Sequence, residues 1–250
     1  DARRVVEAAK ANNRKLVVGY ILRHHPSWQR LISESRGLGG PYAFRMNLNQ
    51  QSSGAAWKIH REILKTTSPI VDCGVHYVDV MCQITDGRPV EVRGMGVPFA
   101  EGLPEGMYNY GQFQVLFDDG SVGWYEAGWG PMISETAYFV KDVMSPKGAV
   151  SIVMEETTGS ADINAHTQTS KLRVHHAETG DDGELLREDD WLSMEGEPDH
   201  QALCDLEQDY LYRAIVDDAD LSRHMSDAVD SLNICLAADE SIRSGKTVTL

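Results

Sequence analysis

The sequence has 250 residues, enough for one large domain or two smaller ones with a substantial core. Hydrophobic residues make up 42% of it and charged residues 24%, as is typical of globular proteins. The formal net charge of −15 argues against nucleic acid or an anionic membrane surface as a main partner, because binding phosphates requires a basic surface. No apolar run reaches the roughly 18 residues that predict a transmembrane helix.

The cysteines predict the cellular compartment of the protein, and the first residues of the sequence indicate a longer polypeptide. The four cysteines lie in apolar helical contexts without paired spacing, which predicts reduced core cysteines rather than a disulfide framework or a zinc site. We therefore expect a reducing compartment, the cytoplasm. The chain starts without Met, inside a helical pattern, so we expect a longer polypeptide in which an export signal could lie upstream.

The first third of the chain is predicted to be mainly helical, with two strands. A helix followed by a short, continuously apolar strand, as at the start, is typical of the end of a parallel α/β unit. The predicted elements are a helix at 1–13, a strand at 15–22, a helix at 27–36 that ends at Gly37, a strand at 42–48, and helices at 55–65 and 69–86.

Strand signals dominate from residue 90 to about residue 176. The strands are expected at 90–97, 112–117, 122–127, 138–143, 149–154 and 171–176, the second and third forming a hairpin. An acidic loop at 178–190 precedes helices at 201–216 and 225–244 and a strand-like end. The sum predicts an α+β fold, a largely antiparallel open sheet with helices on one face, preceded by a remnant of a doubly wound α/β domain.

A polar stripe on an otherwise apolar helix is the best candidate site. Asp72, His76 and Asp79 recur one turn apart on the predicted helix 69–86. Ionisable groups on a helix that is apolar on most of its circumference must be paired or must face a cavity. Residues four apart have Cβ atoms roughly 5–6 Å apart, so the Asp72 carboxylate can bond one imidazole nitrogen of His76 and leave the other free. This pattern predicts a general base, with Asp79 able to hold a substrate hydroxyl.

Other interpretations of the stripe stay open. It could be a satisfied polar cluster that ties the helix to the sheet, or a metal site with a further ligand such as His24 or His60. Arg23 ends the predicted strand 15–22, where α/β sheets commonly bind ligands, although an ordinary surface ion pair is the alternative. His60 lies on the preceding helix and could reach the same pocket.

Three segments of the chain resemble one family of oxidoreductases. V-D-C-G-V-H-Y-V-D (71–79) is similar to the D-x-G-x-H-x-x-D signature of the Gfo/Idh/MocA family. V-G-Y-I-L-R-H-H-P (18–26) resembles the segment where that family leaves its nucleotide-binding domain, and residues 231–246 resemble its closing helix. The three matches occur in the expected order and together span the chain.

The resemblance implies a division of the chain and a cofactor. Residues 1–25 would be the last helix and strand of a Rossmann-type domain, and residues 26–250 a substrate-binding domain that forms oligomers through its open sheet face. NAD or NADP would be bound mainly by residues upstream of Asp1, and the partner would be a small sugar or polyol. His76 would be the acid/base with Asp72 as its partner; Asp79, Arg23 and His60 would contact substrate, and no residue would bind a metal.

Departures from the family pattern leave the substrate open. The glycine-rich stretch usual before the signature is replaced by Thr66-Thr67-Ser68-Pro69, which indicates a divergent subgroup. The glycine fingerprint and the lysine of the family's E-K-P motif would fall upstream of Asp1. We therefore expect an NAD(P)-dependent sugar or polyol dehydrogenase of which residues 1–250 alone are inactive. The alternatives are a non-enzymatic ligand-binding or oligomerisation domain of the same fold and a metal-dependent lyase or hydrolase.

Overall fold

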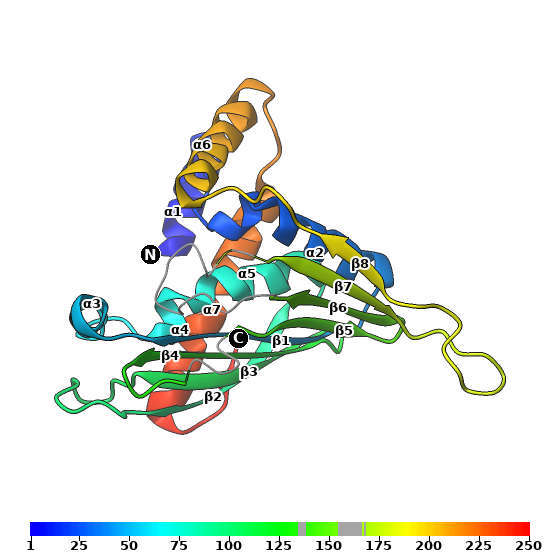
Figure 1. Ribbon diagram of the computed structural model, residues 1–250. Coiled ribbons are helices and arrows are strands. Elements are labelled where there is room, and N and C mark those ends of the chain that lie inside the picture. The colour runs from blue at the N-terminus through cyan, green and yellow to red at the C-terminus, as the bar shows by residue number, and fades with distance from the viewer. Residues whose placement is uncertain (135–138, 155–166, 168) are drawn as a thin grey trace.

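One open sheet with helices stacked on one side of it makes up the protein. The computed structural model describes residues 1–134, 139–154, 167 and 169–250. Within these residues, nine strands form one sheet in the order β8-β7-β6-β5-β1-β4-β3-β2-β9. Strands β1 and β4 are parallel, and the other pairs of neighbours are antiparallel. Figure 1 shows α2, α5 and α7 on one side of the sheet, so the predicted fold class is confirmed.

The elements follow the sequence patterns closely in the second half of the chain. The strands are β1 Ala43–Gln51, β2 Pro89–Val97, β3 Tyr110–Phe117, β4 Val122–Gly130, β5 Lys141–Ser145, β6 Gly148–Val153, β7 Lys171–His176, β8 Asp190–Ser193 and β9 Val248–Thr249. The helices are α1 Ala2–Ala11, the 3-10 helix η1 Ile21–His24, α2 Pro26–Leu38, α3 Gly54–Ile63, α4 Pro69–Asp72, α5 Gly74–Ile84, α6 His200–Val216 and α7 Ser222–Ser244.

The core lies between the sheet and the helices. Side chains alternate along a strand, so Phe44, Met46 and Leu48 of β1 all point toward the helices and are at most 3% exposed. Helix α5 is apolar on most of its surface and lies in the middle of this layer, in contact with α2 and α7. Its burial holds Asp79 inside the molecule, whereas His76 is half-buried and Asp72, in α4, is exposed.

The predicted strand over residues 15–22 is wrong. Residues 14–20 are irregular and the following η1 is a 3-10 helix. A strand needs a neighbour for its backbone groups, and no strand of the described residues pairs with this segment. A side chain supplies a partner instead, since the Val18 N–H lies 2.9 Å from Nε2 of His224.

Four further features differ from the prediction. The helix expected over 69–86 is split at Cys73 into α4 and α5. Helix α2 continues through Gly37 and ends at Leu38, and the capping residue Gly39 has φ 78°, which suits glycine. Strand β8 was not predicted and lies directly after the acidic loop. Of the strand predicted at 138–143, Tyr138 lies outside the described residues, and β5 begins at Lys141.

The state of the cysteines agrees with the prediction of reduced thiols. All four cysteines are free, and Cys82 and Cys235 are buried. In the part of the chain that the structure describes, no helix has both the length and the hydrophobicity to cross a membrane.

Candidate active site

A cavity of about 530 Å³ lies beside the signature segment. Its walls come from the segment around η1, from β1 and β4, and from helices α3, α4, α5 and α6. Asp72, His76 and His60 line it, together with Gln50 and Trp129. The structure therefore brings three of the predicted site residues into one cavity.

His76 is a half-buried, neutral base. Its Nδ1 is buried and has no hydrogen-bond partner among the described residues. The ring meets Tyr20 edge-on, with 5.6 Å between ring centroids. Burial lowers the pKa of His76 to about 4, because the charged imidazolium loses its hydration. The imidazole is thus neutral at pH 7 and able to accept a proton.

Asp72 does not bond His76, contrary to the prediction. The contact of its carboxylate is with the Cys73 thiol, 3.7 Å from Sγ to Oδ2. The helix is interrupted at Cys73, so Asp72 lies at the end of α4 and His76 lies in α5. The spacing of a continuous helix therefore does not apply to this pair. Burial raises the pKa of Asp72, whose carboxyl group still lines the cavity.

His60 is held in place by two contacts. Its Nδ1 lies 2.9 Å from Oγ of Ser52, and its ring stacks on Trp129 at a centroid distance of 4.6 Å and an interplanar angle of 11°. The Trp129 indole N–H donates to Oε1 of Gln50 at 2.7 Å, which fixes the indole in turn. These contacts orient a histidine from α3 at the wall of the cavity that also holds His76.

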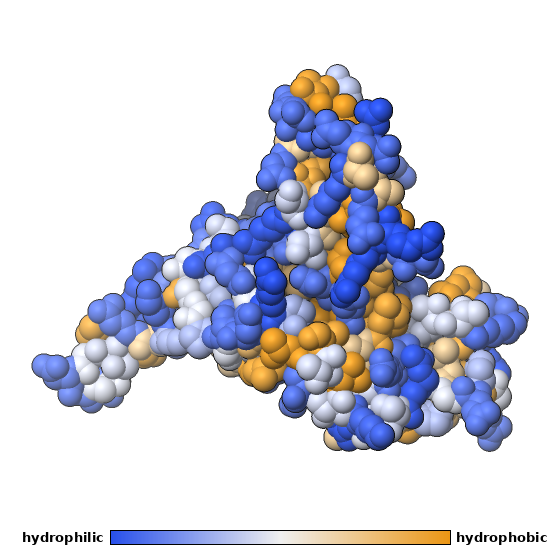
Figure 2. Space-filling view, turned by 180° about the vertical axis from the view of Figure 1, so that it is seen from behind, coloured by the Kyte–Doolittle hydropathy of each residue, from blue (hydrophilic) through white to orange (hydrophobic). Residues whose placement is uncertain are grey.

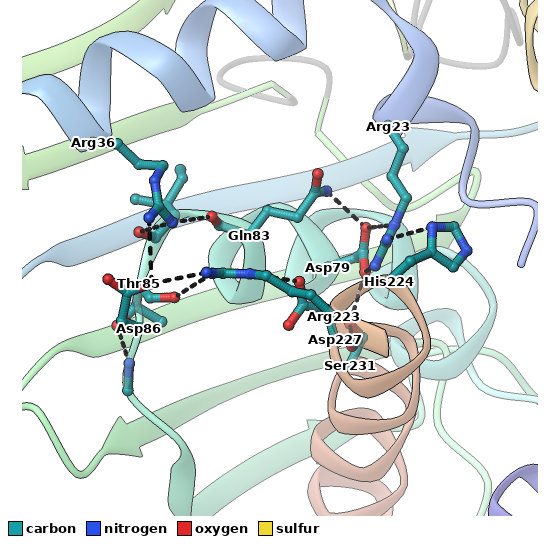
Figure 3. A network of polar contacts seen from close by, with 12 residues as sticks. Arg23, Arg36, Asp79, Gln83, Thr85, Asp86, Arg223, His224, Asp227 and Ser231 are labelled. Carbon is teal, nitrogen blue, oxygen red and sulfur yellow. Dashed lines mark hydrogen bonds and ion pairs between the residues drawn. The ribbon is translucent and has the colours of Figure 1, made fainter. Parts of the chain in front are cut away.

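Arg23 and Asp79 form an internal ion pair rather than a substrate-binding surface (Figure 3). The Arg23 guanidinium donates from Nε to Oδ2 of Asp79 at 2.7 Å, and a second, shorter bond joins Nη2 to Oδ1. Gln83 and Ser231 also donate to this carboxylate, at 2.9 and 3.1 Å. Asp79 is 0% exposed and does not line the cavity of His76. The pair instead ties η1 to α5 and α7.

The ion pair continues into a polar network that the sequence did not reveal. Arg23 Nη1 lies 2.8 Å from Nδ1 of His224, and burial, with the nearby Arg23 charge, lowers the pKa of His224 to about 3. Burial raises the pKa of Asp227 to about 6, against the opposing effect of Arg223. These partners come from α7, about 200 positions from Arg23, so no local pattern could indicate them. Gln83 alone continues the stripe by one turn.

Metal ligation finds no support in this arrangement. Across residues 1–134, 139–154, 167 and 169–250, no three His, Cys, Asp or Glu side chains lie close enough together to hold a metal ion. His24, the other ligand considered, lines a separate cavity beside Arg23.

The comparisons with known proteins show the fold of the chain and the family that part of it resembles. Residues 29–137 match the family model of the GFO/IDH/MocA C-terminal domain. This match covers less than half of the chain and shows which domain these residues resemble. No curated protein matches the sequence. The matched residues include His60, Asp72, His76 and Asp79.

Solved oxidoreductases share this fold across the whole chain. An aldose-aldose oxidoreductase from Caulobacter crescentus, complexed with glycerol, is 20% identical with a TM-score of 0.73, over 100% of this chain and 68% of that one. An NAD-binding oxidoreductase from Klebsiella pneumoniae is 16% identical with a TM-score of 0.71, over 99% and 70%. An oxidoreductase from Agrobacterium radiobacter, in complex with NAD+, L-tartaric acid and magnesium, is 14% identical with a TM-score of 0.68, over 99% and 68%. The chain thus shares the fold of these solved oxidoreductases.

Proposed function

We propose that this chain is the substrate-binding and catalytic part of an NAD(P)-dependent oxidoreductase that acts on a hydroxyl group of a sugar or polyol. One observation carries the proposal: a neutral histidine in the signature segment, His76, lines a cavity of about 530 Å³ whose other walls bear hydrogen-bonding side chains. A small-molecule site is usually a cavity with a small number of convergent polar groups and a titratable residue whose pKa is shifted, here a histidine. Solved proteins of this fold hold glycerol or NAD+, which supports a polyol substrate and a nicotinamide cofactor.

His76 would accept the proton of the reacting hydroxyl. The nicotinamide supplies the hydride acceptor when bound, and oxidising an alcohol releases a proton as well. Because Nδ1 of His76 is enclosed, we assign the proton to Nε2. Asp72 and His60 would hold neighbouring hydroxyls from two sides, and the Arg23–Asp79 pair would position η1 against α5. In the reverse reaction the same His76 would donate the proton.

The dinucleotide would be held mainly outside the residues described above. A glycine-rich turn between a parallel strand and a helix, the usual pyrophosphate site, does not occur among them. Figure 2 shows hydrophobic surface at the top of the molecule, over α6, and further down its middle. Exposed apolar side chains of α6 include Leu206, Tyr212, Ile215 and Val216. Such a patch favours a packing partner, and we propose that a Rossmann-type domain, to which residues 1–25 would belong, covers it.

An assay of hydroxyl oxidation tests the proposal. The full-length protein is incubated with NAD or NADP and a set of aldoses and polyols, and formation of the reduced nicotinamide is followed by absorbance. We expect turnover with at least one of these substrates, and no turnover by residues 1–250 alone. Binding of sugars without any turnover by the full-length protein would favour the non-enzymatic alternative. Turnover that requires an added metal and no nicotinamide would favour the lyase or hydrolase.

The open face of the sheet is a second surface that favours a packing partner. It exposes apolar side chains from the strands β2, β3, β4 and β5, each between 40% and 60% exposed: Met95, Val97, Leu116, Val122 and Met144. We propose that this face forms the interface of a homo-oligomer, since exposed apolar side chains on a sheet favour association. Light scattering should give a mass of at least two chains, and replacing Met95 and Leu116 by Lys should lower it. A monomeric mass at micromolar concentration would contradict this interface.

A further inference from the structure

A carboxylate on α6 lies in the cavity and has no role in the mechanism above. His200, Cys204 and Glu207 recur at helical spacing on α6, and all three line the cavity of His76. Within the described residues, Glu207 has neither a hydrogen bond nor an ion pair. A carboxylate in a cavity without a partner retains its full capacity to accept hydrogen bonds from a ligand.

The Glu207 carboxylate lies directly against the backbone of Gly19. A Cβ atom at position 19 would be 2.8 Å from Oε1 and 3.1 Å from Oε2 of Glu207, closer than side-chain atoms normally approach. The glycine therefore leaves the space in which the carboxylate lies. Its backbone φ is not in the left-handed region, so this close approach, rather than the chain conformation, is what an alanine would disturb.

The fixed charges of the cavity are both negative. Asp72 and Glu207 line it, and no lysine or arginine does so in the described parts of the chain. Carboxylates in a partly enclosed site bind hydroxyl groups through strong, charge-assisted hydrogen bonds. They also disfavour anions, because like charges brought together out of bulk water repel one another. The cavity thus suits a ligand rich in hydroxyl groups and without negative charge.

We propose that Glu207 binds a substrate hydroxyl and makes the site selective for an uncharged, polyhydroxylated substrate over a phosphorylated or carboxylated sugar. Gly19 acts as the positioning residue that admits this carboxylate. The inference rests on the proposed function, of which it specifies the substrate class.

A charge-neutral variant of the full-length protein tests the selectivity. Glucose and glucuronate share a ring and differ in one carboxylate, so the ratio of their kcat/KM values reports the discrimination. We expect Glu207→Gln to raise the KM for glucose about tenfold, the usual effect of losing a hydrogen bond to a charged group, with kcat changed little. The preference for glucose over glucuronate should fall by a similar factor. Asp205→Asn is the matched control, since Asp205 lies on the same helix outside the cavity and bonds Gln201.

A double-mutant cycle tests the role of Gly19. Gly19→Ala should raise the KM for glucose in the wild-type background and leave it unchanged in a Glu207→Ala background, where no carboxylate remains to be displaced. Equal effects in both backgrounds would show that Gly19 acts independently of Glu207.

Binding separates this inference from the proposed function. Calorimetric titration with the same two sugars, without cofactor, measures the selectivity even if the protein turns over neither. Tighter binding of glucose that Glu207→Gln weakens supports the inference. Equal binding of both sugars, binding of neither, or a Glu207→Gln variant that behaves like Asp205→Asn would overturn it. Failure of turnover alone would overturn only the proposed function.

Discussion

Replacing Asp79 by Asn should lower the free energy of unfolding by about 3–5 kcal/mol, the usual cost of breaking a buried ion pair. The substitution keeps the shape of the side chain and removes its charge, so the Arg23 guanidinium loses the counterion to which it is hydrogen-bonded. Only 7% of the Arg23 side chain is exposed, and water therefore cannot replace the lost partner. Urea unfolding followed by circular dichroism measures the effect.

The open sheet face offers a matched control for this variant. Asp142→Asn makes the same chemical change in the pair of Asp142 with Arg45, whose side chain is 57% exposed. We expect a cost of at most about 1 kcal/mol there, because water solvates the released arginine. In the double variant Arg23→Met/Asp79→Asn, part of the Asp79→Asn loss should be recovered, since no buried charge remains. Equal costs at the two aspartates would mean that the Arg23–Asp79 pair is solvated, as a substrate-binding surface would be.

Replacing His76 by Asn should reduce kcat/KM for the hydroxyl substrate by about 10²–10⁴-fold, the usual contribution of a general base. The folded state should persist, because an amide is a smaller polar group and Nδ1 of His76 has no hydrogen-bond partner among the described residues. Steady-state kinetics of the full-length protein, with thermal unfolding measured alongside, separates loss of chemistry from loss of fold. His24→Asn is the control, since His24 does not line this cavity.

The pH dependence gives this prediction a second measurement. A base must be unprotonated to act, and burial lowers the pKa of His76 to about 4, so kcat/KM of the wild type should decline only as the pH falls toward 4. The free energy of unfolding should also depend on pH, for the same reason. Between pH 6.5 and 4 the unfolded chain protonates this histidine and the folded chain does not, so stability decreases with falling pH, and less so in His76→Asn. An acid limb near pH 6.5 in the rate profile would contradict the assignment of His76 as the enclosed base.

Local patterns predicted those elements of the fold that depend on neighbours in sequence. The alternation of Tyr42, Phe44, Met46 and Leu48 marks a strand with one buried face, and all four side chains are at most 8% exposed. The apolar run at 15–22 has the same local signal but no partner strand in the described structure, so it remains irregular. Periodicity reports which side chains avoid water. It does not report whether a hydrogen-bonded neighbour exists.

For the candidate site as well, the sequence predicted some features and the tertiary structure decided others. The sequence by itself determined that His76 and Asp79 lie on a largely apolar helix that packs into the core, because helical spacing and hydrophobicity are local properties. Only the tertiary structure decided what each of them meets. The interruption of the helix at Cys73 separates Asp72 from His76, and Arg23 pairs with Asp79. Glu207 reaches the cavity from a helix more than 100 residues away in the sequence. Hydrogen bonds and charges act over a few ångströms in space, and only the folded chain sets which residues come that close.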